Sequence, residues 1–322
     1  MEKEEKQFER DELLADISEM YYEEGQTQAE IAKVTGKTRS AISRMLTEAR
    51  QKGIVEIHIH HPLRFDSSLE NELIARFPLR GAHVLVGQNN NNIDNLNKHL
   101  GRAASTLFDT LLTPNQTIGI AWGTTVSSAI DAYTGKDLLN TSVVQLVGIL
   151  GSTHHRYSGQ ALVERLARKI KGTGVYLYTP FIVENKEAVN ILLRDQSINE
   201  AITLGKNCDV ALLGIGSTNP DFCSLYKGGH ITKADLDSLL TANAVGDVGG
   251  HYYDIHGDLV DVEFQHRLMS ISWDDLRKIP IRLGMAGHPM KAEAIIGAIR
   301  GGSINELVTD QKTALKILEL SD

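Results

Sequence analysis

Apolar positions near the beginning of the chain recur with helical spacing in three successive stretches. Residues 11–25 form one amphipathic pattern that ends at Gly25, and residues 27–46 hold two shorter patterns separated by Gly36. A period of 3.6 residues predicts helices that share a core, and Gly36 can take the positive φ of a sharp turn. This pattern predicts a helix-turn-helix supported by a preceding helix. The expected apolar faces comprise Leu13, Leu14, Ile17, Met20 and Tyr21, then Ala29, Ile31, Ala32 and Val34, then Ile42, Met45 and Leu46.

From about residue 66 onward, short apolar runs alternate with helical segments. The runs are 82–87, 117–123, 142–151, 174–180, 208–216, 279–287 and 304–310. The helical segments include 125–133, 160–170, 186–205 and 291–300. Continuous apolar strands separated by helices predict a parallel sheet covered on both faces. The expected fold class is α/β, with an N-terminal all-α helix-turn-helix of the winged type followed by a Rossmann-like parallel-sheet domain.

A strictly alternating segment lies between these two regions. Residues 54–60, IVEIHIH, predict a strand that forms a wing or leads out of the helical unit, and Pro62 ends it. The expected organisation is a charged, frayed lead-in over 1–10, a helix-turn-helix domain over 11–61 and a larger α/β domain over 62–322.

Charge is unevenly distributed along the chain. The net charge is −8 overall, yet residues 33–53 contain six basic residues and one acidic residue, Glu48, which gives +5. Residues 1–32 sum to −8. Positive charge is therefore concentrated where a phosphate backbone would lie, and double-stranded DNA is the expected partner. The alternative is an ordinary helical hairpin with a solvated polar face.

The last helix of this unit would present polar side chains on its open face. Thr38 is a suitable N-cap for that helix. A helix in the major groove brings such side chains to base edges and phosphates. The expected DNA-binding residues are Gln28, Thr38, Arg39, Ser40, Ser43 and Arg44.

A candidate anion site follows the run that begins at residue 117. The strand leads into Gly123, and Thr124 and Thr125 begin a helix. Glycine lets the backbone approach an anion, and the hydroxyls and free N–H groups of the first turn can bind phosphate oxygens. The segment is neither a P-loop nor a dinucleotide fingerprint. The alternative is a simple capped helix after a strand.

Three further residues are candidates for the same ligand. Lys291 lies at the start of a helix, where a cation opposes the helix dipole unless a bound anion balances it, or else it is an exposed surface lysine. Asp247, in the glycine-rich segment 244–250, would accept hydrogen bonds from sugar hydroxyls or cap its own turn. Gln160, at another helix start, is a polyol-facing candidate.

Other chemistries find little support in the sequence. Cys208 and Cys223 provide neither a disulfide framework nor zinc-site spacing and are expected to be buried small residues. The adjacent His154 and His155 lack partners at metal-binding spacing, so no metal is expected. No arrangement of catalytic residues is recognised. With no apolar leader and no run of roughly 18 apolar residues, we expect a cytoplasmic protein without a membrane partner.

With both regions interpreted, the chain resembles the SorC family of sugar-responsive bacterial transcriptional regulators from end to end. The motifs that carry the resemblance are TQAEIAKVTGKTRSAISRML, KGIVEIHI, GIAWGTT, QLVGILG, VALLGIGS, GGHIT, VGDVGGHYYDIHGDLVD, IPIRLGMAG, MKAEAIIGAIRGG and INELVTD, in that order. The chain departs from the family pattern at the loop containing His288, Pro289 and Met290, where His288 could titrate against a ligand. It also departs at His251, where some members have arginine.

The resemblance implies an effector domain similar to sugar-phosphate isomerases and glucosamine-phosphate deaminases that binds a phosphorylated sugar without processing it. It implies that Gly123, Thr124 and Thr125 form the phosphate loop, that Asp247 contacts sugar hydroxyls, and that Lys291 faces the phosphate. Gln160 and Arg267 are further candidates. Residues 62–322 would then bind the effector and mediate oligomerisation, with no cofactor.

The expected function is that of a DNA-binding transcriptional regulator of carbohydrate metabolism whose operator affinity is controlled by a phosphorylated sugar. A dimer or tetramer would place paired helices on a two-fold operator. One alternative is a sugar-phosphate isomerase or deaminase with an attached DNA-binding domain, for which Asp247 and His251 are the nearest acid–base pair. Another is a DNA-binding protein whose large domain only oligomerises.

Overall fold

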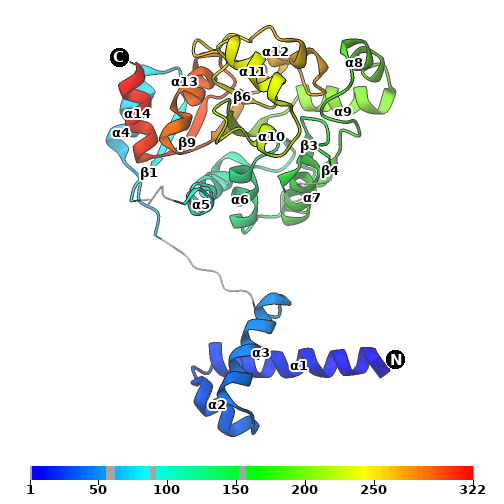
Figure 1. Cartoon of the computed structure of the whole chain (residues 1–322), viewed down its shortest axis with the longest axis vertical. Coiled ribbons are helices and arrows are strands. Elements are labelled where there is room, and N and C mark those ends of the chain that lie inside the picture. Colours follow the sequence, from blue (N-terminus) through cyan, green and yellow to red (C-terminus); the bar gives the residue numbers. More distant parts are fainter. Residues whose placement is uncertain (1, 56–61, 88–91, 152–156, 322) are drawn as a thin grey trace. The chain divides into compact units, whose positions relative to one another are not determined.

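The computed structural model describes residues 2–55, 62–87, 92–151 and 157–321, with side chains from residue 7 onward. The chain divides into two compact units, Met1–Pro62 and Leu63–Asp322, which are considered separately below (Figure 1).

The first unit is helical. Its elements are α1 (Glu2–Tyr22), α2 (Gln28–Thr35) and α3 (Arg39–Gln51). Thr27 and Glu30 form a reciprocal capping box at the start of α2, and Gly36 ends α2 with φ 66°. The predicted helix-turn-helix is therefore confirmed. The core consists of Leu14, Ile17, Ile31, Ile42, Met45, Leu46 and Ala49.

Two details of this unit differ from the sequence-based expectation. The lead-in expected to be frayed belongs to α1, which begins at Glu2. Val34 is 69% exposed and Ala29 is also exposed, so the buried face of α2 depends on Ile31. A helix of only eight residues buries a narrow stripe. The strand expected over 54–60 falls largely outside the described residues.

The second unit is an α/β domain. Its strands are β1 (Gly81–Leu85), β2 (Thr117–Ile120), β3 (Ser142–Gln145), β4 (Thr173–Val175), β5 (Val210–Ser217), β6 (Gly246–Val248), β7 (His251–Tyr253), β8 (Ile281–Met285) and β9 (Glu306–Asp310). Its helices are α4 (Ser67–Arg76), α5 (Ile93–Leu111), α6 (Thr124–Ala132), α7 (Gly159–Ile170), α8 (Lys186–Leu192), α9 (Gln196–Lys206), α10 (Ser224–Lys227), α11 (Lys233–Thr241), α12 (Trp273–Lys278), α13 (Ala292–Arg300) and α14 (Gln311–Ser321), with 3-10 turns η2 (Glu263–Arg267) and η3 (Pro289–Lys291).

Seven strands form the parallel sheet that the sequence predicts, and their order is β1-β9-β8-β5-β2-β3-β4. Helices cover both of its faces. One core contains buried residues of α5, α6 and α7, which lie together in Figure 1, and the other contains those of α9, α13 and α14. The short hairpin of β6 and β7 adds to β5 in antiparallel orientation.

The helix expected over 186–205 is two helices. Asp195 interrupts the pattern, because its carboxylate accepts hydrogen bonds from the backbone N–H groups of Ser197 (2.9 Å) and Ile198 (3.3 Å) and caps α9. The strands are shorter than the apolar runs that predicted them, since the apolar residues of each run continue into the loops at the strand ends.

Candidate functional site

Helix α3 separates apolar from polar side chains sharply. Thr38 caps it by accepting a hydrogen bond from the N–H of Ala41 at 3.2 Å, as expected for an N-cap. Its buried residues are Ile42, Met45, Leu46 and Ala49. The polar residues Thr38, Arg39, Ser40, Ser43, Arg44 and Thr47 are all exposed.

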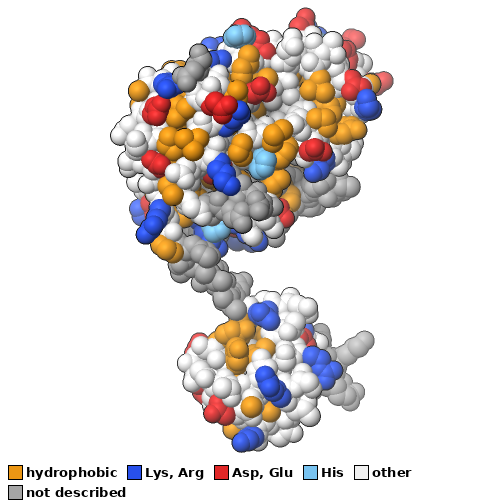
Figure 2. Space-filling view, turned by 60° about the vertical axis from the view of Figure 1, so that its left-hand side comes forward, with side chains coloured by type: hydrophobic (Ala, Val, Ile, Leu, Met, Phe, Trp, Pro, Cys, Tyr) orange, Lys and Arg blue, Asp and Glu red, His pale blue; other side chains and the backbone are white. Residues whose placement is uncertain are grey.

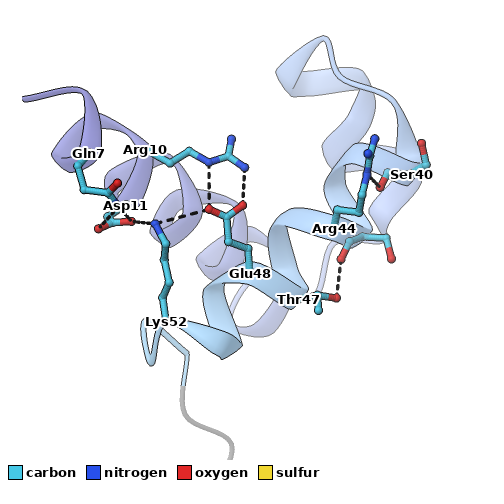
Figure 3. Close-up of polar contacts among 9 residues, drawn as sticks. Gln7, Arg10, Asp11, Ser40, Arg44, Thr47, Glu48 and Lys52 are labelled. Atoms are coloured by element: carbon cyan, nitrogen blue, oxygen red, sulfur yellow. Dashed lines mark hydrogen bonds and ion pairs between the residues drawn. The ribbon is translucent and has the colours of Figure 1, made fainter. Parts of the chain in front are cut away.

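The exposed side chains are held by contacts within the helix (Figure 3). Arg44 Nε donates to the Ser40 carbonyl at 3.4 Å, and the Thr47 hydroxyl donates to the Ser43 carbonyl at 3.0 Å. In the described part of the chain, Arg39 and Arg44 have no ion-pair partner. Thr47 was missed by the sequence analysis, although it follows Ser43 by one helical turn. Gln28 is half-buried in the first turn of α2.

A separate ion-pair cluster fixes α1 to α3. Glu48 pairs with Arg10 at 2.6 Å and with Lys52 at 3.5 Å, while Lys52 also pairs with Asp11 at 2.6 Å. Figure 3 shows this cluster apart from Arg44 and Ser40. The hydrogen bond from Arg10 lowers the pKa of Glu48. The cluster neutralises charge at this end of α3, and basic side chains still spread over the visible face of the unit (Figure 2).

In the α/β unit, the candidate residues surround the carboxyl end of β5. Strands β2 and β5 are neighbours in the sheet. After β2 the chain continues to β3 on the far side of β2, and after β5 it continues to β8 on the far side of β5. The strand order therefore reverses between β2 and β5, and open α/β sheets bind ligands at such a point. A Cβ added to Gly123 would lie 3.5 Å from the Cα of Gly214, so the loop after β2 runs directly beside β5.

The N-terminus of α6 faces this edge. Gly123 precedes the helix with φ 150°, and in the described structure no side chain caps the helix. Neighbouring α5 and α7 are capped by Asn92 and Ser158. Uncapped N–H groups at a helix start favour an anion. Thr124 is exposed, whereas Thr125 is buried.

Lys291 and Asp247 lie beside the same strand end. Lys291 is half-buried and its Nζ donates to the Ile215 carbonyl at 2.9 Å. Asp247 is buried, pairs with Gly216 across β6 and β5, and accepts a hydrogen bond from the N–H of Gly250 at 3.3 Å. Burial raises the pKa of Asp247 to about 6. Burial lowers the pKa of Lys291, while the charge of Asp247 opposes that change.

The remaining candidates are placed differently. Gln160 is half-buried in the first turn of α7, which follows β3. Arg267 donates from Nε to the Val183 carbonyl at 2.9 Å and pairs with Glu263 at 3.5 Å, so it is tied to its own neighbourhood.

The two histidines at which the chain departs from the family pattern have structural contacts. His288 has φ 88°, its N–H donates to the carboxylate of Asp310 at 2.9 Å, and its ring lies on Phe222. Burial lowers the pKa of His288, which favours the neutral ring. The His251 ring bonds the Ile271 carbonyl at 2.8 Å.

An open hollow of about 690 Å³ lies nearby, and its described lining does not include Thr124, Asp247 or Lys291. Its lining includes Tyr178, Phe181, Gly229 and His230. Phe181 packs against Trp122, the residue before Gly123, with ring centroids 4.3 Å apart. The hollow therefore lies close to the loop that begins α6 and has the size of a small-molecule site.

Among the described residues, no group of three or more His, Cys, Asp or Glu side chains could hold a metal ion. His154 and His155 fall outside those residues. Cys208 and Cys223 are buried, as expected, and burial raises the pKa of both thiols. No described helix is long and apolar enough to cross a membrane.

A helix-turn-helix unit joined to a parallel α/β domain with a candidate ligand site at its sheet edge is the arrangement of a ligand-responsive DNA-binding protein. Comparisons with known proteins identify the family. Residues 61–319 match the family described as "Putative sugar-binding domain", and residues 15–52 match region 4 of sigma-70. The chain belongs to the SorC family of sugar-responsive, DNA-binding transcriptional regulators, so the resemblance of its motifs is confirmed.

Individual relatives align over nearly the whole chain. The transcriptional regulator LsrR of Enterobacter sp. (strain 638) is 30% identical over 97% of this chain and 94% of its own. The sorbitol operon regulator of Klebsiella pneumoniae is 30% identical, covering 95% and 98%. The crystal structure of the latter, full-length SorC, superposes with a TM-score of 0.71 at 29% identity over 97% of this chain and 99% of that one.

A transcriptional regulator from Streptococcus pneumoniae TIGR4 is similar over most of the chain. It gives a TM-score of 0.72 at 26% identity and covers 79% of this chain and 97% of that one.

Proposed function

We propose that this regulator binds a phosphorylated sugar at the carboxyl end of β5 and that the bound ligand changes its affinity for operator DNA. The observation that carries this proposal is the arrangement of Lys291 and the uncapped start of α6 on the two sides of β5. A half-buried ammonium group and free helix N–H groups favour a dianionic group. Asp247 offers carboxylate oxygens to sugar hydroxyls.

The proposed chemistry is binding without turnover. His251 was the residue expected from sequence to act with Asp247 as an acid–base pair. The His251 ring is instead held by Ile271 and by the Ser270 hydroxyl, 3.1 Å away. The relatives above are named as regulators, which supports the same conclusion.

At the DNA end, we assign Arg39, Ser40, Ser43 and Arg44 of α3 to the operator, with Thr38 and Gln28 at the helix starts. The exposure of the α3 side chains supports this assignment, as does the absence of ion-pair partners for both arginines within the described residues. A two-fold operator would engage two copies, so we propose a homo-oligomer. A sugar phosphate controls DNA affinity only through its different affinity for two arrangements of that assembly, typically about 1–3 kcal/mol.

A thermal-shift screen of phosphorylated sugars against their free sugars tests the proposal. A cognate ligand at 100 times its Kd stabilises the folded state by about 2.7 kcal/mol, which raises the melting temperature. We expect only phosphate esters to do so, and Lys291→Ala to abolish the shift. Lys312→Ala removes an exposed lysine as the matched control. Equal shifts from free sugars, or an unchanged shift with Lys291→Ala, would contradict the anion site.

A further inference from the structure

Asn97 of α5 contacts both threonines at the start of α6. Its Nδ2 donates to the Thr124 hydroxyl oxygen at 3.2 Å, and its Oδ1 accepts the Thr125 hydroxyl proton at 2.9 Å. Asn97 is half-buried, and it does not belong to any motif singled out in the sequence.

These two hydrogen bonds make the threonines unequal. A hydroxyl has one proton to donate and two lone pairs with which to accept. Thr125 has already donated its proton to Asn97, so its oxygen offers a ligand only lone pairs. Thr124 accepts from Asn97, which leaves its proton free to point away from the amide. Thr124 is also exposed, whereas Thr125 is buried.

A fully ionised phosphoryl group has oxygens that only accept hydrogen bonds. It can therefore bond the Thr124 hydroxyl but gains nothing from the lone pairs of Thr125. The amide group of Asn97 determines this difference, and its position is fixed by the packing of α5 on α6. One turn further along α5, Gly101 lies against Ser128, where an added Cβ would be 2.5 Å from the Ser128 carbonyl carbon.

We infer that Asn97 is a positioning residue that directs the Thr124 hydroxyl toward a phosphoryl oxygen and restricts Thr125 to a structural role. This inference rests on the proposed function and refines it, because both threonines were expected to bind the phosphate. It also restricts the ligand, because the group bound here is an acceptor-only anion. A sugar hydroxyl can both donate and accept, so it could bond either threonine and would not require Thr124 and Thr125 to differ.

The test measures binding of inorganic phosphate to the full-length protein by 31P NMR, together with the melting temperature. Thr124→Val removes the free donor and should weaken phosphate binding by about tenfold, the scale of one charge-assisted hydrogen bond, without lowering the melting temperature. Thr124→Ser restores the hydroxyl and should restore binding. Thr125→Val should lower the melting temperature by a few degrees and change phosphate binding by less than about threefold.

Asn97→Asp tests the positioning residue itself. An aspartate accepts from both threonines and donates to neither, so the Thr124 proton turns toward it and away from the ligand. We expect a larger loss of phosphate binding than with Asn95→Asp, which places the same charge on an exposed residue of the same helix. Equal losses for the two aspartate variants would show that charge alone acts and would overturn the inference.

The remaining outcomes separate the two proposals. If Thr125→Val loses phosphate binding as completely as Thr124→Val with an unmoved melting temperature, both hydroxyls touch the ligand and the inference is wrong, while the proposed function stands. If the wild-type protein does not bind phosphate at concentrations up to about 20 mM, the proposed function fails and the inference fails with it.

Discussion

Gly101 of α5 lies directly against Ser128 of α6, with room for no side chain between the two helices. A Cβ at Gly101 would stand 2.5 Å from the Ser128 Cβ and 2.7 Å from the N–H nitrogen of Ala129. This close approach brings Asn97, one turn earlier on α5, within reach of Thr124 and Thr125. The packing of two helices and the geometry of the proposed anion site therefore depend on the same glycine.

Gly101→Ala is expected to destabilise the protein. Replacing glycine by alanine inside a helix normally stabilises it by roughly 0.5–1 kcal/mol, but the overpacking here costs about 1–3 kcal/mol and should win. Denaturant unfolding measures the net change, and phosphate binding should weaken in parallel. Gly151→Ala, where a Cβ would meet no described atom within 4 Å, is the control for stability. A more stable Gly101→Ala protein would mean that the helices separate without cost.

Arg44→Ala should weaken operator binding by about 1–3 kcal/mol if the side chain reads a base, and should reduce discrimination at one position of the site. If the side chain contacts a phosphate instead, the slope of log affinity against log salt concentration should fall by about one. Binding to all DNA sequences should then weaken alike. Fluorescence anisotropy at several salt concentrations distinguishes the two, for Arg39→Ala as well. Arg194→Ala, an exposed arginine of the α/β unit, is the control. Unchanged operator binding by both α3 variants would contradict the assignment of that helix.

Glu48→Gln should increase non-specific DNA binding. Glu48 is the acidic residue within the basic segment 33–53, and it pairs with both Arg10 and Lys52. Its replacement raises the net charge of the unit by one, which strengthens the electrostatic part of the DNA affinity most at low salt. Binding to a random duplex at low and high salt measures the effect. Glu30→Gln, which removes a charge at the start of α2, provides the charge-matched comparison, and equal gains would show that position is irrelevant.

Asp247→Asn should change how stability depends on pH. Burial raises the pKa of Asp247 to about 6, above its ordinary value, so the folded protein retains a proton that the unfolded chain has released. The stability associated with that proton is fully present below about pH 4 and is lost as the pH rises through about 6. An asparagine does not titrate, so the variant should gain up to about 3 kcal/mol relative to wild type between about pH 4 and pH 7. Parallel stability curves would show that Asp247 does not hold a proton in this range.

The fold could be predicted from sequence because its signals are local. Each apolar run of the large unit contains a strand, and each run lies next to a segment whose apolar residues repeat with the helical period of 3.6 residues. Where a single polar side chain redirects the backbone, the prediction was wrong: Asp195 splits the helix expected over 186–205. The prediction of a frayed lead-in over 1–10 was also wrong, because this highly charged segment forms the first turns of α1.

The candidate site was predicted less completely. Gly123, Thr124 and Lys291 stand beside glycine-rich turns, which sequence reveals. Asn97 lies on the polar side of an otherwise ordinary amphipathic helix and shows its role only when α5 packs on α6. The sequence also cannot show that the His251 ring is hydrogen-bonded to the Ile271 carbonyl, since that contact joins residues 20 positions apart.

The pairing of Gly216 with Asp247 has an evolutionary consequence. A Cβ at Gly216 would lie 1.9 Å from an Asp247 carboxylate oxygen, so any larger residue on β5 must displace the aspartate. Among descendants of this chain, a lineage that keeps the carboxylate is expected to keep the glycine, whereas a lineage that loses the carboxylate is free to lose the glycine. Replacement of Asp247 is therefore expected to precede replacement of Gly216 in any lineage whose specificity changes at this strand end.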